Sequence, residues 1–409
     1  MRRAAALFLL ILALLTAGCW DLHEVEEQAY VTGIGVDKAP GSKIKLLFQV
    51  INPRALGGGA RGVITPGVSI SAKGFRNYEA VGRTVLEAAE AISLAVPLNL
   101  HLAHNREIIF SEKVARGGLL DVMSFFNRRV DMRKLTYPMV TRDKIEVVLD
   151  VPNPLETVPS LRIEAIMRQQ GRKGYFPAIR LGRFIDIMTE KGRETYCPVV
   201  RVKRNPTQSL TPYKSSLTAP EPYLDIEIAG TALFKKDKLV GFLNKEETRG
   251  FLWTQGQVQG GPLLIRCPKE GKYVTLRVLR SKAKIKPEIT SDGRLKVTVE
   301  IREEANLEEI ECHLNVAQVD VIKQLEAMQA KVITQEVMSA VRKAKECKSD
   351  VFGFGSAFHR RYPKQWREME KFWAEQLFPQ VEVKVVADAR IRRTGLRKMP
   401  LTLTPKLEK

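Results

Sequence analysis

Alternating hydrophobic and polar residues predict strands in the first third of the chain. Hydrophobic residues occupy every second position from Ile44 to Val50, and a shorter alternation runs from Val68 to Ala72. Side chains at alternate positions of a strand share one face, so both segments predict half-buried strands. Two further strands are expected at 106–110 and 137–141.

Helical spacing predicts helices around these strands. Hydrophobic residues recur every three or four positions from Val81 to Val96, with Asn77 as the expected N-cap and Pro97 as the residue that ends the helix. Further helical stretches are expected at 112–127, 143–149 and 155–189. Because strands and helices do not alternate strictly, the order favours an α+β fold over a doubly wound sheet.

A run of strands with charged outer faces is predicted from residue 224 onwards. Apolar and charged residues alternate at 224–228 and 297–301, and strands are also expected at 239–243, 263–265 and 274–278. Together they predict an antiparallel sheet with one solvent-exposed face. Asn244 is the expected cap of a short helix that contains Glu247 and Trp253.

A long helix from Val316 to Glu346 is predicted after this sheet. Its apolar stripe passes through Leu325 in the first half and shifts by one residue in the second half, where it passes through Val341. Two interpretations stay open. Either the helix lies across the sheet as part of the core, or one half leaves its own domain and contacts a neighbouring one.

A polar, proline-rich segment from Lys203 to Pro222 predicts a domain boundary. We expect an elongated, multi-domain α+β body with mixed or antiparallel sheets and packed helices, in which the C-terminal domain is an antiparallel sheet with a long helix. The expected divisions are a signal peptide at 1–18, an N-terminal α+β domain at 19–150, a middle domain and Pro-rich linker at 151–222, a C-terminal α+β domain at 223–395 and a basic tail at 396–409.

The first 19 residues have the pattern of an export signal. Arg2 and Arg3 precede an apolar run that ends at Leu15 and is too short to span a bilayer. The small residues after this run end at Cys19 and resemble a bacterial lipobox, in which the cysteine receives S-diacylglycerol and an N-acyl chain. Two or more chains hold a membrane firmly, since each buried methylene contributes about 0.8 kcal/mol. Cys19 is therefore the expected lipid attachment site, and Trp20 is expected beside it at the headgroup level.

The chain has 409 residues and a formal net charge of +20, which becomes +18 without residues 1–18. Such a charge permits nucleic acid, anionic headgroups or an acidic protein as the partner. Export and lipidation favour a membrane surface or its proteins and argue against nucleic acid. A basic cluster that includes Arg390, Arg392 and Arg393 is the candidate for this contact, with a solvated face as the alternative.

Four cysteines remain after Cys19, and they allow three disulfide pairings. The predicted long helix places Cys312 and Cys347 at opposite ends, about 45 Å apart, which argues against a bridge between them. A Cys197–Cys267 bridge stays open, and so do isolated buried thiols. None of the four has the spacing of a zinc or redox motif.

The motifs predict no catalytic residue, no cofactor and no metal. The five histidines form no metal-binding array, no Gly-x-Ser-x-Gly elbow is present, and the Gly57–Gly62 run lacks the lysine of a phosphate-binding loop. The segment Phe352–Gly355 is interpreted as a tight turn that docks the long helix against the last one, rather than as a ligand-stacking site. Trp366 and Trp373 are expected in the core.

Three blocks of sequence carry a family resemblance. Gly18–Asp21 with Val31–Lys38, then 230–253, then 350–373 with a final strand around 381–385, resemble the C-subunit lipoproteins of bacterial spore germinant receptors, the Ger(x)C family. The resemblance runs from about residue 18 to 395. It is looser around His104, and Asp131 stands in an Arg-rich segment where the family usually has a glutamate close to the second arginine.

The resemblance implies a non-catalytic, lipid-anchored subunit on the extracytoplasmic face of the spore inner membrane. It would act with membrane-embedded A and B subunits to trigger germination by nutrients. The alternative is an extracytoplasmic solute-binding lipoprotein that delivers a nutrient to a transporter. That alternative requires an enclosed apolar pocket between two similar lobes, and the sequence has no internal repeat of lobes, so we favour the receptor subunit.

Overall fold

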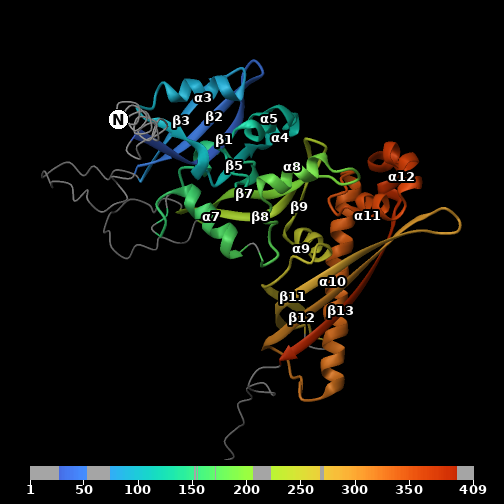
Figure 1. Cartoon of the computed structure of the whole chain (residues 1–409). Coiled ribbons are helices and arrows are strands. Elements are labelled where there is room, and N and C mark those ends of the chain that lie inside the picture. Colours follow the sequence, from blue (N-terminus) through green and yellow to red (C-terminus); the bar gives the residue numbers. More distant parts are fainter. Residues whose placement is uncertain are drawn as a thin grey trace, which may run out of the picture.

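The computed structural model describes residues 27–52, 74–151, 153, 155–170, 172–205, 223–267 and 271–393. In these residues the chain forms two sheets with helices packed on them (Figure 1). The Gly57–Gly62 run and the strand expected at 68–72 lie outside the described residues.

The larger sheet contains strands from residue 28 to residue 243. They are β1 Gln28–Ala39, β2 Lys43–Ile51, β3 Phe75–Gly82, β4 Asn99–His101, β5 Glu107–Ser111, β6 Tyr137–Thr141, β7 Tyr196–Asn205, β8 Tyr223–Lys235 and β9 Lys238–Leu243. Their order is β3-β2-β1-β5-β6-β7-β8-β9, and β4 pairs with β1. The central strands β1, β5, β6 and β7 run parallel, whereas both flanks are antiparallel.

Helices cover both faces of the larger sheet. They are α3 Val85–Ser93, α4 Glu112–Gly117, α5 Leu120–Arg128, α6 Ile145–Val148, α7 Pro159–Gln170 and α8 Leu181–Thr189, with a 3₁₀ turn η2 at Leu102–His104. Ile108 and Phe110 of β5 lie in a core with α3, α4, α5 and α8, while Ile109 lies in a second core with α6 and α7. The strands and helices expected between residues 106 and 189 are therefore confirmed.

The helix expected to begin after Asn77 begins later in the structure. Asn77 lies in β3, which pairs with β2, and its amide donates to Leu149 O at 2.9 Å. Helix α3 has Thr84 as its N-cap, whose Oγ1 accepts the Glu87 N–H at 3.1 Å. A capping residue is a local signal, and here pairing with a distant strand overrides it.

The second sheet lies in the C-terminal part of the chain. Its strands are β10 Pro262–Arg266, β11 Tyr273–Ile289, β12 Leu295–Ile310 and β13 Glu382–Arg393, in that order, with only the β12–β13 pair parallel. The single antiparallel sheet expected from residue 224 onwards is wrong in one respect, because β8 and β9 pair into the larger sheet through β7. The limits of the domains stay a prediction.

Helices connect and cover the two sheets. They are α9 Lys245–Thr254, α10 Val319–Glu346, α11 Phe354–Arg361, α12 Pro363–Met369, the short turns η3 Glu370–Phe372 and η4 Trp373–Leu377, and α13 Phe378–Gln380. Asn244 caps α9 and exchanges hydrogen bonds with Glu247, as expected. The long helix is confirmed as α10, and the fold class is confirmed as α+β with mixed sheets, packed helices and a C-terminal sheet with a long helix.

The two halves of α10 have different neighbours. In the first half Gln329 contacts Glu303 of β12, so this half lies across the second sheet. In the second half Glu336 accepts hydrogen bonds from Arg249 and Trp253 of α9, the helix that follows β9. This change of neighbours accounts for the shift of the apolar stripe, because each half turns its buried side chains towards a different element.

A disulfide joins Cys267 and Cys312, with Cα atoms 6.5 Å apart. The Cys197–Cys267 bridge is therefore wrong, and Cys197 and Cys347 are free thiols. Cys267 follows β10 and Cys312 follows β12. Both strands pair with β11, which brings the C-terminal ends of β10 and β12 to the same end of the sheet. Sheet register decides this pairing, and spacing along the chain does not reveal it.

The buried carboxyl of Glu303 predicts a pH-dependent stability. Its Oε1 has no hydrogen-bond partner among the described residues, and burial, followed by the neighbouring Glu304, raises the pKa of Glu303 to about 8. An acid whose pKa is higher in the folded state than in the unfolded state stabilises the fold more at low pH. For Glu303 this contribution is complete below the unfolded pKa, near 4.5, and is lost as the pH rises to about 8.

We therefore expect Glu303→Gln to match the wild type at pH 5 and to be more stable by on the order of 2 kcal/mol at pH 9. Thermal melts between pH 5 and pH 9 measure this difference. The control is Glu308→Gln, which removes an exposed carboxyl paired with Arg277. Parallel pH profiles for wild type and Glu303→Gln would contradict the prediction.

Candidate functional site

The carboxylate of Asp350 organises the junction between the C-terminal helices and the rest of the protein. It accepts hydrogen bonds from the backbone N–H groups of Gly353 (3.0 Å), Phe354 (3.1 Å) and Gly355 (2.7 Å) and from Trp373 Nε1 (3.0 Å). The carboxylate is fully buried, and burial raises the pKa of Asp350 to about 6 although the four donors lower it.

The Phe-Gly-Phe-Gly segment forms a tight turn, as expected, while its role in docking the long helix against the last one stays a prediction. Gly353 has a φ of 79°, in the left-handed region that suits glycine, and it precedes the first residue of α11. The rings of Phe352 and Phe354 stack with centroids 5.0 Å apart. Trp366 and Trp373 are both buried, with centroids 5.3 Å apart, so their expected place in the core is confirmed.

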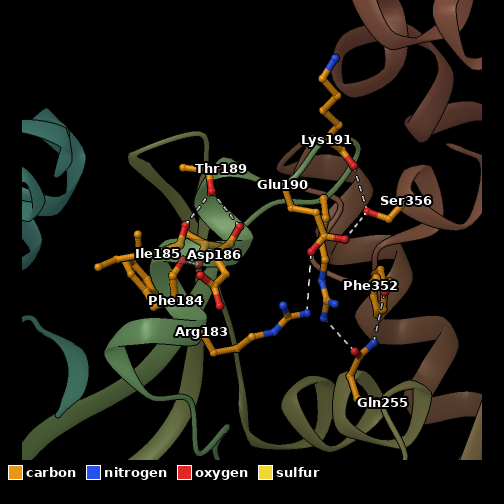
Figure 2. A network of polar contacts seen from close by, with 12 residues as sticks. Arg183, Phe184, Ile185, Asp186, Thr189, Glu190, Lys191, Gln255, Phe352 and Ser356 are labelled. Atoms are coloured by element: carbon orange, nitrogen blue, oxygen red, sulfur yellow. Dashed lines mark hydrogen bonds and ion pairs between the residues drawn. The ribbon is translucent and has the colours of Figure 1, made fainter. Parts of the chain in front are cut away.

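A second contact joins α11 to the loop between α8 and β7. The Ser356 N–H donates to Gly192 O at 2.8 Å. Ser356 Oγ lies 2.8 Å from Glu190 Oε1 and 2.9 Å from Lys191 O (Figure 2). A Cβ on Gly355 would lie 2.6 Å from Gly192 O, so the two backbones touch without room for a side chain. This contact requires glycine at position 355.

The end of α9 completes the network. Arg193 donates to Gln255 Oε1 at 2.8 Å. Gln255 Nε2 donates in turn to Phe352 O at 3.3 Å (Figure 2). Segments near residues 190, 255 and 355 are thus held together by polar contacts around a buried aromatic core. The arrangement fixes the C-terminal helices against the larger sheet.

Glu194 is a second perturbed acid at this junction. Its backbone N–H donates to Asp350 O at 2.9 Å, and its carboxylate accepts the N–H of Lys236 in the β8–β9 turn. Burial raises the pKa of Glu194 to about 7, and the charge of Asp350 adds to the effect. Two carboxyl groups with raised pKa values therefore lie where β7, the β8–β9 turn and α11 meet.

The predicted site residues lie elsewhere. Cys19 and Trp20 lie outside the described residues. Arg390 and Arg392 lie on β13 and are paired, Arg390 with Asp388 (2.9 Å) and Arg392 with Glu304 (2.7 Å). Arg393 is exposed at the end of the same strand. The structure thus brings the three arginines together on one edge strand, with two of the charges shared with carboxylates.

The described residues contain no group of three or more His, Cys, Asp or Glu side chains that could hold a metal ion. His101 and His104 pack against Tyr30, with the His104 and Tyr30 ring centroids 5.0 Å apart. Burial lowers the pKa of His104. Their geometry is that of an aromatic cluster beside β1.

A large concavity of about 830 Å³ lies beside β7, β8 and the start of α9. Its charged lining residues are four cations and four acids, namely Arg142, Arg201, Lys245, Lys343, Asp143, Glu227, Glu246 and Glu247. Arg201 pairs with Glu227 at 2.6 Å, and the Arg142 guanidinium lies 4.0 Å from the centre of the Phe242 ring. The charges in the lining of the concavity are therefore balanced.

Sequence reasoning did not assign roles to Asp350, Gly192 or Glu194. Asp350 carried a signal, since an aspartate before a glycine-rich turn often accepts backbone N–H groups a few residues on. Gly192 and Glu194 carried none, because their partners are more than 150 residues and more than 40 residues away along the chain.

No helix among the described residues is long and apolar enough to cross a membrane. Family models match two parts of the chain: a spore germination protein N-terminal domain at 21–202 and the spore germination B3/GerAC-like C-terminal domain at 229–395.

Relatives match along nearly the whole chain. Spore germination protein KC of Bacillus subtilis is 26% identical, covering 97% of both chains. Spore germination protein B3 of the same species is 24% identical, covering 96% of this chain and 97% of its own. The crystal structure of the GerBC protein has the same fold, with a TM-score of 0.53 at 21% identity, covering 91% of this chain and 99% of that one. The chain therefore belongs to the GerAC-like family of spore germination proteins, the germinant receptor C subunits.

Proposed function

We propose that this protein is a non-catalytic, lipid-anchored subunit of a nutrient germinant receptor that acts with membrane-embedded A and B subunits. The observation that carries the proposal is Cys19, which ends the small residues after a short apolar run typical of an export signal, in a chain whose remainder matches both family models. Acylation at Cys19 would hold the folded body on the extracytoplasmic face of the spore inner membrane.

The receptor role fits the observed surface better than solute capture does. A solute-binding protein needs an enclosed, mostly apolar pocket with a few convergent polar groups. The 830 Å³ concavity has four cations and four acids in its lining instead. We propose that protein surfaces, rather than a captured nutrient, connect this subunit to the receptor. Trp20 at the headgroup level and the exposed Arg393 are proposed contacts with the membrane or its proteins.

Replacing the anchor residue tests the proposal. We expect Cys19→Ala to lower the membrane-bound fraction in spores roughly tenfold or more, because the acyl chains supply the main membrane affinity. Nutrient-triggered germination should slow in parallel, while the melting temperature of the body stays unchanged. Fractionation with immunodetection and the loss of optical density after nutrient addition measure these effects.

The matched control is Cys347→Ala, which removes a free, half-buried thiol of the folded body. This variant should stay in the membrane fraction. If Cys19→Ala remained membrane-bound to the wild-type extent and supported normal germination, lipidation would not be the anchor.

A further inference from the structure

A pocket lined by three arginines lies between α7, the segment that leads into α8, and the segment that follows α9. Its volume is about 450 Å³. The lining residues are Tyr137, Met167, Arg168, Arg172, Ala178, Arg180, Gln257 and Gln259, and we call it the arginine pocket. The lining includes no carboxylate, in contrast to the larger concavity beside β8.

The positive charge of the arginine pocket is only partly compensated. Arg168 pairs with Glu164 at 2.8 Å, and the same carboxylate pairs with Arg106 at 3.2 Å. Within the part of the chain that the structure describes, neither Arg172 nor Arg180 forms an ion pair with a carboxylate. Arg168 and Arg106 therefore share one carboxylate, while Arg172 and Arg180 have no paired acid among the described residues.

Arg180 is held in a fixed orientation despite lacking an acidic partner. Its guanidinium lies 3.6 Å from the centre of the Tyr137 ring, and it donates a hydrogen bond to Leu135 O. Burial lowers the pKa of Arg180; Tyr137 and the charge of Glu164 oppose this shift, and the charges of Arg168 and Arg106 add to it. A half-buried cation without a counter-charge is costly, and a bound anion would offset that cost.

The walls of the pocket are fixed by backbone hydrogen bonds. The Gln259 N–H donates to Arg172 O at 2.8 Å, which ties the segment after α9 to the segment after α7. The Leu181 N–H donates to Thr136 O at 2.7 Å and holds the Arg180 backbone next to β6. The backbone that carries Arg172 and Arg180 is therefore in place before any ligand arrives, which lowers the entropic cost of binding.

A neighbouring hollow extends the positive field. It shares Gln259 with the arginine pocket and is lined by Lys282, Lys284 and Arg302. Its one acid, Glu300, pairs with Lys286, which lies outside that lining. Both sides of the segment that follows α9 thus attract negative charge.

We propose that the arginine pocket binds a small dianion through carboxylate or phosphate oxygens. Guanidinium groups match these oxygens with two parallel hydrogen bonds, and the amides of Gln257 and Gln259 can donate further ones. Tyr137, Met167 and Ala178 give the pocket an apolar part that fits a short carbon skeleton. A zwitterionic amino acid is disfavoured, because its ammonium group would lie among three arginines.

Titration calorimetry of the full mature chain in detergent micelles tests this site, with inorganic phosphate and succinate as probes at constant low ionic strength. We expect saturable binding of both probes at one site. Arg172→Gln should weaken binding about tenfold or more, because the anion loses a charged hydrogen bond. The Arg172 side chain is exposed, so its replacement should leave the core intact. Arg180→Lys keeps the charge but loses the planar fork and should weaken binding similarly.

The matched control is Arg128→Gln, an exposed arginine at the end of α5 that lies outside the pocket lining. It should leave the affinity unchanged, and alanine should not compete with succinate. Three results would each overturn the site: no saturable binding of either probe, equal weakening by Arg128→Gln and Arg172→Gln, or competition by alanine as strong as that by succinate.

A second arm identifies the source of the phosphate group. Vesicles containing phosphatidic acid are mixed with the Cys19→Ala protein, which lacks the acyl anchor. If Arg172→Gln weakens vesicle binding and inorganic phosphate competes, the pocket takes a lipid headgroup. If Arg172→Gln weakens only the binding of free phosphate, the pocket takes a soluble dianion. Both results support the same chemistry.

Discussion

Asp350→Ala is expected to lower the free energy of unfolding by about 4 kcal/mol, because it leaves four buried donors without an acceptor. Three of these are backbone N–H groups of the turn before and at the start of α11, and the fourth is Trp373 Nε1. Loss of the acceptor should release α11 from the junction while the larger sheet stays folded locally. Urea unfolding of the purified chain measures the change.

Asp350→Asn should cost about half as much. Oδ1 of Asp350 accepts from Gly353 and Phe354, and an amide oxygen can keep these two bonds. The amide NH₂ would face the two groups that donate to Oδ2, Gly355 N–H and Trp373 Nε1–H. Donor would then face donor, so those two bonds are lost.

The loss of stability in Asp350→Ala should also depend on pH. The pKa of Asp350 is about 6 in the folded protein against 3.8 for an ordinary aspartate, so its proton-linked contribution to stability is full below pH 3.8 and is lost as the pH rises to about 6. The difference in the free energy of unfolding between wild type and Asp350→Ala should therefore be larger at pH 4.5 than at pH 7.5. The control is Asp388→Ala, an exposed carboxyl paired with Arg390, which should cost less than about 1 kcal/mol. Equal losses for the two alanine variants would contradict the role of Asp350.

Local signals in the sequence predicted the elements whose ends are decided locally. Helix α9 begins as expected because Asn244 and Glu247 exchange hydrogen bonds within a single turn. Helix α10 was recognisable from its apolar spacing, and even the change in its surroundings was visible as a shifted stripe. These features depend on residues three or four positions apart, which a sequence displays directly.

Features that depend on register across a sheet were beyond the sequence. Asn77 has the side chain of a cap but lies in β3, since β2 supplies a strand partner. Cys267 pairs with Cys312 because β10 and β12 flank β11. β8 and β9 joined the larger sheet for the same kind of reason, although their own alternation resembled that of the strands after them.

The junction and the arginine pocket share this limitation. Gly192 and Gly355 touch only after the sheet and the C-terminal helices have packed, and glycine is common in loops that make no such contact. Arg172 and Arg180 are unremarkable basic residues in the sequence. They form a site only because Gln259 N–H binds Arg172 O and because Tyr137 supports Arg180.

Among the glycines that the structure describes, Gly250 is the one at which replacement by alanine is expected to be most damaging. Gly250 lies in α9 against the backbone of α10, and a Cβ at this position would overlap with the carbonyl of Glu336 and lie 3.0 Å from Val337 N. Backbone atoms inside a long helix cannot rotate away as a side chain can. The methyl group must therefore push α9 and α10 apart, at a cost of about 3 kcal/mol or more.

The separation of α9 and α10 should be visible at a buried tryptophan. Trp253 Nε1 donates to Glu336 Oε2 at 2.8 Å, and Arg249 Nε donates to the same oxygen at 2.9 Å. Displacement of α9 would stretch both bonds and leave the buried Glu336 carboxylate short of partners, so tryptophan emission should shift to longer wavelength as the stability falls. Gly260→Ala is the matched control, because its Cβ would meet no atom closer than Arg172 O at 3.9 Å. Gly260→Ala should be neutral or slightly stabilising, because alanine makes the unfolded chain less flexible. Equal unfolding midpoints for Gly250→Ala and Gly260→Ala would show that the close approach of α9 to α10 does not require glycine.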